Sequence, residues 1–384
     1  MKLVVDGVFF QLTNTGIARV WSSILPRLAC YPDVEIVLLD RGNCPSIDRV
    51  QRINFPSYTM NAYTAADSLL IDDYCQELGA DVFSSTYYTT PVSTPSVLIV
   101  YDMIPEVMNF NLAGRVWQEK QLAISFASYY ACISENTRSD LSRYYPITTD
   151  RSIVTHCGVD HQIFRPQDPS RVDDFKSRFG ILKPFFLLVG SRKQGHGYKN
   201  AIHTFNSARK IRDFEFELLC VGGEESIDPD VLSNLPANVS ARRVDLKDAE
   251  LACAYSGATA LIFPSLYEGF GMPIIEAMAC GCPVITTRNG SLPEVAGDAA
   301  IFVSGYDENE MRNAMMSVRE ETCRMQLLDK GRRRSTHYDW DAMTRGFHRL
   351  LKKAQEERGT SEIKKFFDQW KRLRYMQAEV DGAT

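Results

Sequence analysis

The sequence predicts an α/β protein built from two Rossmann-like domains, and three observations support this fold class. The chain has 384 residues, which is longer than one hydrophobic core usually supports, so we expect two domains. Short apolar runs alternate with longer amphipathic segments along most of the chain. These runs are apolar on both faces, as parallel strands are when helices cover both sides of a sheet.

The expected strands form two series, one for each domain. The first series consists of 2–7, 34–40, 81–85, 97–102, 130–134 and 152–158. The second series consists of 185–190, 216–223, 260–265, 283–287 and 299–303. Open α/β sheets bind ligands beyond the carboxyl ends of their strands, so we expect a cleft lined by those ends of both sheets.

The domain boundaries follow from where this alternation stops. The polar stretch 164-FRPQDPSR-171 interrupts it and is the predicted linker. We therefore expect an N-terminal domain over 1–167, a C-terminal domain over 168–358, and a separate helix over 359–384.

Composition excludes several classes of protein. A net charge of -5 argues against a nucleic-acid-binding surface. The start MKLVVDGVFF lacks the features of a signal peptide, and no window of about 18 residues is apolar throughout, so we expect a cytoplasmic protein. The ten cysteines are scattered, which fits buried thiols in that compartment, and the six histidines show no metal-ligand spacing.

The stretch 264-PSLYEGFGMPIIEAMACGCPVI-285 carries the strongest functional signal. It predicts a strand, a glycine-containing turn, and a helix opened by Pro273. Backbone N–H groups at such a junction, including those near Phe270 and Gly271, can bind an anionic or hydroxyl-rich ligand. Glu268 and Glu276 can then hold hydroxyl groups from two directions. Among 48 acidic residues such a pair also arises by chance, and the positive helix end alone could favour Glu276.

The whole string, together with 291-SLPEVAGDAA-300, resembles the E-x7-E donor-sugar motif of retaining glycosyltransferases of family 4. The resemblance covers nearly the entire chain, and the first half resembles bacterial mannosyltransferases of O-antigen and polysaccharide assembly. It implies the two-Rossmann GT-B architecture, in which the N-terminal domain binds the acceptor and the C-terminal domain binds a nucleotide sugar.

A basic, glycine-rich turn in 189-VGSRKQGHGYKN-200 follows a predicted strand. Arg192 and Lys199 match the Arg and Lys that family members use against the donor diphosphate, where cations stabilise the charge on the leaving group. The loop between them is longer than in the family, so Lys199 aligns more securely than Arg192. The alternative is a solvated basic loop.

The N-terminal domain offers two further candidates. In 13-TNTGIARVW-21, Gly16 resembles the family's glycine loop, whose N–H groups face the diphosphate or the acceptor, although a glycine before a helix is common. In 98-LIVYDMIPE-106, many family members have a histidine where this chain has Tyr101, which puts that contact with the donor sugar in doubt. Asp102 can orient a sugar or acceptor hydroxyl, or it can cap the next turn.

Two predictions concern the rest of the C-terminal half. Leu246, in 244-VDLKDAELACAYSGA-258, is expected to contact the nucleotide base. The basic, aromatic segment 361-SEIKKFFDQWKRLRYM-376 is expected to pack back on the first domain, as in comparable enzymes, with Trp340 and Trp370 as anchors. A helix of this composition can also rest on an anionic membrane as a peripheral contact.

The resemblance implies retaining transfer of a hexose from a nucleoside-diphosphate sugar to a hydroxyl of a glycan or lipid-linked acceptor. Mannose from GDP-mannose is the first donor expected. Glu268, Arg192, Lys199 and Asp102 form the predicted catalytic set. The predicted donor-binding set is Gly16, Phe270, Gly271, Glu276 and Leu246. No metal or other cofactor is expected.

Two alternatives come from other functional classes. A nucleotide-sugar 2-epimerase can share this architecture, and it would form product without an acceptor. A catalytically silent sugar-binding protein is the second alternative, and Tyr101 is the residue that favours it. The presence of Glu268, Glu276, Arg192 and Lys199 argues against loss of activity.

Overall fold

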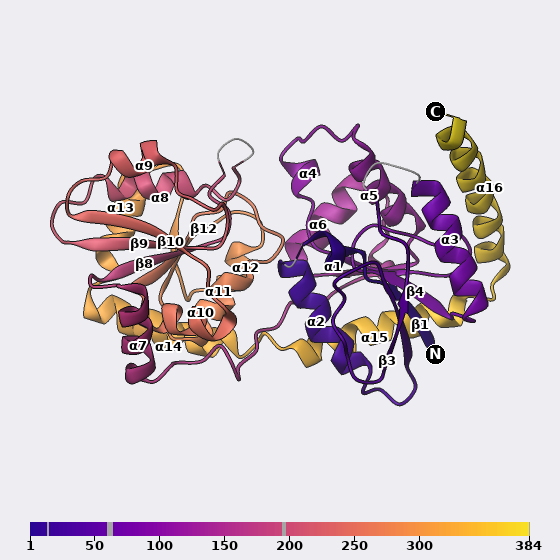
Figure 1. Ribbon diagram of the computed structural model, residues 1–384, viewed down its shortest axis with the longest axis horizontal. Helices are drawn as coiled ribbons and strands as arrows, with labels where there is room; N and C mark the ends of the chain where they lie inside the picture. Colours follow the sequence, from indigo (N-terminus) through magenta and orange to yellow (C-terminus); the bar gives the residue numbers. More distant parts are fainter. Residues whose placement is uncertain (14, 60–63, 194–196, 384) are drawn as a thin grey trace. The chain divides into compact units, whose positions relative to one another are not determined.

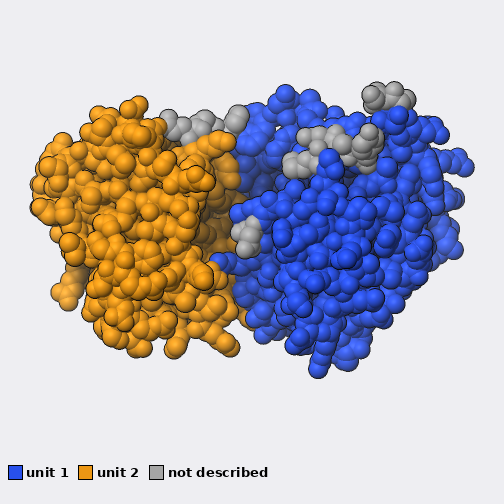
Figure 2. Space-filling view, in the orientation of Figure 1, with its two compact units in different colours: residues 1–156, 340–384 blue, residues 157–339 orange. Residues whose placement is uncertain are grey.

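The computed structural model describes residues 1–13, 15–59, 64–193 and 197–383. The chain divides into two compact units, which Figure 2 colours separately. Unit 1 comprises residues 1–156 and 340–384, and unit 2 comprises residues 157–339. The first boundary therefore lies before the expected linker, and the return to unit 1 begins at Trp340 rather than near residue 359.

Local packing explains both differences. Phe164, in the expected linker, is buried and lies edge-on to Tyr255, with ring centroids 6.3 Å apart, so this segment belongs to the core of unit 2. Helix α15 (Trp340–Glu357) packs on α2 (Gly16–Leu28) of unit 1. Within that contact the rings of Trp21 and Phe347 meet edge to face at 5.7 Å.

Unit 1 contains parallel strands in the orders β3-β2-β1-β4 and β5-β6-β7. A parallel bridge from Phe83 to Ser96 connects the two groups. The strands are β1 (Lys2–Asp6), β2 (Glu35–Asp40), β3 (Val50–Asn54), β4 (Val82–Ser85), β5 (Val97–Val100), β6 (Tyr129–Cys132) and β7 (Ser152–Val154). The remaining helices are α1 (Val8–Leu12), α3 (Thr64–Glu77), α4 (Ile104–Val107), α5 (Arg115–Phe126), α6 (Glu135–Tyr144), the 3₁₀ turn η1 (Thr149–Arg151) and α16 (Ser361–Ala383).

Unit 2 contains one parallel sheet in the order β10-β9-β8-β11-β12-β13, with helices on both faces (Figure 1). Its strands are β8 (Phe185–Val189), β9 (Phe216–Val221), β10 (Val239–Val244), β11 (Ala260–Phe263), β12 (Val284–Thr287) and β13 (Ile301–Val303). Its helices are α7 (Pro169–Phe179), α8 (Ala201–Ala208), α9 (Pro229–Ser233), α10 (Asp248–Gly257), α11 (Met272–Ala279), α12 (Leu292–Ala296), α13 (Glu308–Ser317) and α14 (Glu321–Ser335).

The strand order of unit 2 reverses direction between β8 and β11. These two strands are neighbours in the sheet, and they are its first and fourth strands in chain order. In doubly wound sheets this switch point leaves the loops after both strands free to approach a common ligand. The predicted α/β fold with two Rossmann-like domains is confirmed, whereas the cleft expected between them stays a prediction.

Helix α16 packs on unit 1, along α3. Trp370 is buried, and its ring centroid lies 5.3 Å from that of Phe126. Arg374, also buried, donates to Glu119 at 2.8 Å and to Ser68 at 2.7 Å. The helix also exposes large side chains, namely Phe366, Leu373, Tyr375, Met376 and Val380. The peripheral membrane contact stays a prediction. Among the described residues, no helix has the length and apolarity needed to span a bilayer.

Candidate functional site

The loops that carry the predicted donor-site residues follow adjacent strands of unit 2. Arg192 and Lys199 lie in the segment after β8, and Glu268 lies in the segment after β11. Since β8 and β11 are paired in parallel, their carboxyl ends lie at the same edge of the sheet. The fold therefore brings the two loops together at the switch point.

Lys199 and Glu268 form an ion pair at this edge. The Lys199 ammonium donates to Glu268 Oε1 at 2.7 Å, and the Ser265 hydroxyl donates to the same oxygen at 2.6 Å. The Glu268 side chain is only 10 % exposed, whereas that of Lys199 is 27 % exposed. The ammonium also lies 5.5 Å from the ring centroid of Phe263 and 5.2 Å from that of Tyr198. A carboxylate and a cation held side by side can bind hydroxyl groups and a phosphate oxygen of one ligand.

A second loop, at the start of α12, supports the backbone of Glu268. Ser291 donates to the carbonyl of Glu268 through both its N–H, at 3.1 Å, and its hydroxyl, at 3.0 Å. The same hydroxyl lies 2.9 Å from the carbonyl oxygen of Phe270. Gly290 has a φ of +57°, and a Cβ at this position would lie 2.7 Å from the Glu268 carbonyl oxygen. Only a glycine leaves room for this approach. The sequence pattern gives no sign of these roles of Ser291, Ser265 and Gly290.

Replacement of Gly290 by Ala is expected to displace the Glu268 loop. The new Cβ would meet both the N and the O of Glu268 at under 3.0 Å, and the left-handed conformation adds roughly 1–2 kcal/mol of strain. Gly79→Ala is the matched control, because Gly79 has a φ of +65° but no atom within 4 Å of its Cβ position. Thermal unfolding should show a larger loss for Gly290→Ala, and turnover should fall only in that variant. Equal stability losses and equal turnover in the two variants would contradict the close approach.

Helix α11 begins at the end of the Glu268 loop. Its N-cap residue Gly271 has a φ of +102°, which is a backbone conformation that favours glycine, and Pro273 lies in the first turn as predicted. Glu276 is buried and accepts a hydrogen bond of 3.1 Å from the Tyr255 hydroxyl. Burial and the nearby Glu276 carboxylate raise the pKa of Tyr255 well above its usual value. Phe270 is buried edge-on against Tyr338, with centroids 5.5 Å apart.

The Arg192 guanidinium is directed at backbone carbonyls of a neighbouring loop. It donates to Gly222 O at 2.6 Å and to Glu224 O. The Glu224 carboxylate in turn accepts hydrogen bonds from the backbone N–H of Arg192 and from the Ser191 hydroxyl, both at 2.5 Å. Burial raises the pKa of Glu224, but the hydrogen bonds from Ser191 and Arg192 outweigh this effect and lower the pKa below its usual value. In this arrangement Arg192 joins the loops after β8 and β9, and its contact with a diphosphate stays a prediction.

The remaining predicted residues lie on three other segments. Leu246 is half-buried in the segment between β10 and α10. In unit 1, Gly16 is the first residue of α2, directly after Thr15. Asp102 follows β5 and accepts from the N–H of Ile104 at 2.9 Å, the turn-capping bond that the sequence left open as an alternative.

Tyr101 lies inside unit 1. It occupies the position at which glycosyltransferases of family 4 often have a histidine. Its hydroxyl accepts a hydrogen bond of 2.6 Å from the indole N–H of Trp21, on α2, and the Tyr101 side chain is buried. The buried Lys120 lies beside the same strand end and donates to Glu106 at 2.7 Å and to the Asp102 carbonyl at 3.3 Å. These contacts fix the backbone around Tyr101 and Asp102. Sequence reasoning missed Lys120, since a lysine in an amphipathic helix gives no signal of burial.

Two cavities in the described part of the chain lie away from the predicted site. One of about 320 Å³ lies in unit 1 between the end of α5 and the start of α16, and one of about 230 Å³ lies between α7 and α10 of unit 2. In the part of the chain that the structure covers, no group of three or more His, Cys, Asp and Glu side chains is placed to hold a metal ion.

Comparison with known proteins gives matches for both the fold and part of the sequence. The family model described as "Glycosyl transferases group 1" matches residues 183–321, which include the loops after β8 and β11. The chain is 24 % identical over 380 residues to O-antigen chain mannosyltransferase B of Escherichia coli, and the match covers 90 % of this chain and 97 % of that protein.

A second relative and a solved structure extend the comparison. MMP alpha-(1->4)-mannosyltransferase of Mycolicibacterium hassiacum is 26 % identical over 218 residues, covering 55 % of this chain and 50 % of that protein. The structure of Alr3699/HepE from Anabaena in complex with UDP-glucose matches with a TM-score of 0.70 at 16 % identity, covering 92 % of this chain and all of that one. The Lys199–Glu268 pair thus lies inside a group 1 glycosyl transferase domain, and the chain is a glycosyltransferase of the GT-B fold, similar to bacterial O-antigen mannosyltransferases.

Proposed function

We propose that the protein is a retaining glycosyltransferase of family 4 that moves a hexose from a nucleoside-diphosphate sugar to a hydroxyl of a glycan or lipid-linked acceptor. The observation that carries the proposal is the Lys199–Glu268 ion pair at the switch point between β8 and β11. Ligands of doubly wound sheets bind at this position, and the pair offers the two kinds of group that a sugar diphosphate requires.

Glu268 and Lys199 have separate tasks in this proposal. The carboxylate of Glu268 accepts hydrogen bonds from hydroxyls of the donor sugar. The Lys199 ammonium has three N–H donors, so it can keep its bond to Glu268 while another N–H turns to the phosphate. Since Lys199 is only partly exposed, its charge is less screened than in bulk water, and it stabilises the negative charge that develops on the leaving diphosphate.

GDP-mannose is the proposed donor, supported by two relatives whose names describe mannosyltransferases. The structurally similar HepE was solved with UDP-glucose, so the nucleotide has to be tested directly. A thermal-shift panel of GDP, UDP, ADP and TDP does this, because a ligand at about 100 times its dissociation constant stabilises by about 2.7 kcal/mol. We expect the largest shift with GDP. A larger shift with another nucleotide would overturn the proposed donor, and no shift with any of them would overturn the nucleotide-sugar proposal.

Glu276 is proposed to bind the ribose of the nucleotide. The Glu276→Gln variant keeps an acceptor for the Tyr255 hydroxyl but removes the charge, so nucleotide affinity should fall roughly tenfold, or about 1.4 kcal/mol. Glu321→Gln, an exposed glutamate at the start of α14, is the matched control and should bind as wild type does. Isothermal titration calorimetry measures both. Equal affinities of wild type and Glu276→Gln would reject the ribose contact.

The proposal also includes a diphosphate held by protein cations and N–H groups rather than by a divalent ion. Lys199, with the N–H groups at the start of α11, supplies positive potential at the switch point. Transfer should therefore persist in excess EDTA, measured as nucleotide release in the presence of acceptor. A complete loss of activity that Mg²⁺ or Mn²⁺ restores would show that a metal ion neutralises the leaving group.

A further inference from the structure

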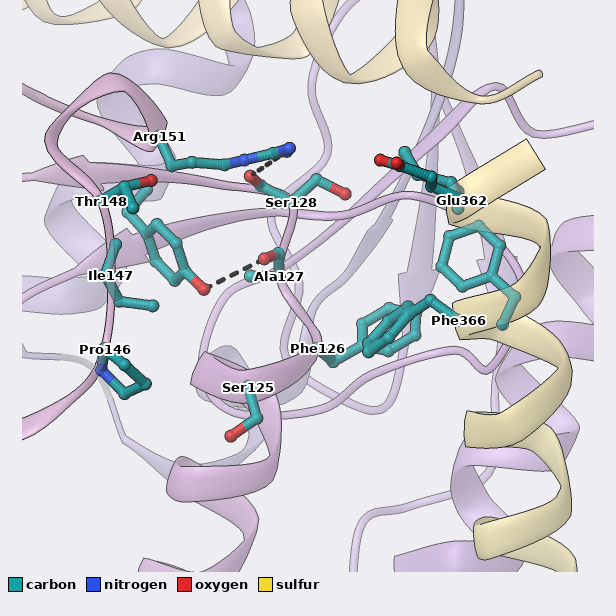
Figure 3. A pocket seen from close by; sticks show the side chains of 13 residues that line it. Ser125, Phe126, Ala127, Ser128, Pro146, Ile147, Thr148, Arg151, Glu362 and Phe366 are labelled. Atoms are coloured by element: carbon teal, nitrogen blue, oxygen red, sulfur yellow. Dashed lines mark hydrogen bonds between the residues drawn. The ribbon is translucent and has the colours of Figure 1, made fainter. Parts of the chain in front are cut away.

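A groove in unit 1 lies outside every site described above. Its volume is about 320 Å³, within the range of small-ligand sites. The end of α5, the start of β6, the loop before η1 and the first two turns of α16 form its walls (Figure 3). It therefore opens at the amino ends of β6 and β7, whereas Asp102 lies beyond the carboxyl end of β5 in the same group of parallel strands. The groove and the predicted acceptor contact lie at opposite edges of that sheet.

One side of the groove is aromatic. Phe126, at the end of α5, packs against Phe366 and Phe367 of α16, with centroids 6.1 Å and 5.7 Å apart. Phe366 is stacked on Trp370 at 5.7 Å and is nevertheless 36 % exposed. Because one face of the Phe366 ring packs on Trp370 while the side chain stays partly exposed, another part of the ring can contact a ligand.

The other side of the groove mixes apolar and polar groups, since Pro146 and Ile147 lie there with Thr148 and Arg151 (Figure 3). The positive charge of Arg151 is already paired. Arg151 donates to the Ser128 carbonyl at 3.3 Å (Figure 3). It also donates to Glu357 at 2.9 Å. Glu362, on the α16 side with Phe366, adds a carboxylate to the lining, and Ser128 and Thr148 add hydroxyl groups. Because Arg151 is paired with Glu357 and Glu362 adds a further negative charge, the groove does not favour an anionic ligand. Its hydroxyl, guanidinium and carboxylate groups also do not favour a wholly apolar chain.

A carbohydrate has both properties that these walls demand. A hexose ring presents an apolar face of C–H groups, which can lie on an aromatic ring, and a rim of hydroxyls, which exchange hydrogen bonds with carboxylate, guanidinium and hydroxyl groups. We propose that this groove binds a segment of neutral glycan, away from the site of transfer. The choice of mannose-containing glycan as probe rests on the proposed function. The groove would hold an acceptor chain at a second point, which raises its effective concentration.

The test measures glycan binding without any donor. Calorimetry or saturation-transfer NMR with α-linked mannotetraose, and with maltotetraose as a second neutral probe, should show binding to the full chain. Phe366→Ala should weaken it roughly tenfold, equal to about 1.4 kcal/mol. Leu373→Ala is the matched control, since Leu373 is an exposed apolar residue of the same helix that does not line the groove. GDP should not compete with the glycan.

Four outcomes would overturn the inference. The first is that neither tetrasaccharide binds, and the second is that wild type and Phe366→Ala bind equally. The third is that GDP displaces the glycan. The fourth is that dodecyl phosphate binds in place of the glycan with the same dependence on Phe366. Because the nucleotide panel is independent of this groove, a failure here leaves the proposed donor site standing, and a failure of the panel leaves glycan binding testable.

Discussion

Replacing Lys199 by Met is expected to lower kcat by roughly 10²–10³, which is the usual effect of removing one preorganised electrostatic contact with a transition state. The side chain keeps its length and its packing near Phe263, but the proposed diphosphate site loses the positive charge of Lys199. Glu268→Gln should also reduce kcat, because a neutral amide holds the donor hydroxyls less strongly than a carboxylate does. Steady-state kinetics with a saturating donor measure both changes.

The design includes a control for loss of charge alone. Lys193→Met removes an exposed lysine from the same segment after β8 and should leave kcat within about twofold of wild type. The double variant Lys199→Met/Glu268→Gln should lose less than the product of the two single effects, since the two side chains form one ion pair. An unchanged kcat in both single variants would return this loop to the solvated-surface interpretation.

Among the variants considered, Arg374→Met is expected to lower the free energy of unfolding most. Arg374 and Glu119 have side chains that are 1 % and 7 % exposed, and the guanidinium also donates to Ser68. Removing the cation leaves the Glu119 carboxylate buried without its charge partner, which typically costs about 3–5 kcal/mol. Chemical unfolding should show this loss. Limited proteolysis should also cut α16 earlier, because Arg374 anchors it to α5 and α3.

Arg372→Met is the control for this prediction, because Arg372 is an exposed arginine of the same helix. Exposed charges contribute about 0–1 kcal/mol, so its unfolding midpoint should stay close to that of wild type. A double replacement of Arg374 and Glu119 by Met and Leu should recover part of the loss, since no buried charge is then left unpaired. Equal stabilities of Arg374→Met and Arg372→Met would contradict the anchoring role.

The sequence predicted the strands of both units that form short apolar runs, and these include the edge strands β7 and β13. It missed β3 (Val50–Asn54) and β10 (Val239–Val244), which are edge strands of their sheets. Both carry arginines and have half-buried or exposed residues, so neither shows the apolar run that identifies a central parallel strand. The expected domain boundaries differ from the observed ones because they too depend on tertiary contacts. Whether Phe164 or α15 belongs to one core or the other depends on tertiary contacts that no local pattern shows.

The sequence also predicted Lys199 and Glu268, and the structure brings them into contact. It did not predict the residues that hold them, because Ser265, Gly290 and Ser291 act through hydrogen bonds and close approach across the fold. The sequence around an arginine in a glycine-rich turn does not indicate which hydrogen-bond acceptors its guanidinium contacts. Arg192 donates to backbone carbonyls of the 222–224 loop, so its proposed action on the diphosphate has to be measured.

The anomeric configuration of the product distinguishes retaining transfer from the other reactions considered. The protein should be incubated with GDP-mannose and a mannose-containing acceptor, and the new linkage examined by ¹H NMR through the coupling constants of the anomeric proton and carbon. We expect an α-linked product, with the configuration of the donor retained, and a loss of this product in Lys199→Met and Glu268→Gln. A β-linked product would contradict the retaining mechanism, and an isomerised nucleotide sugar formed without acceptor would show an epimerase instead.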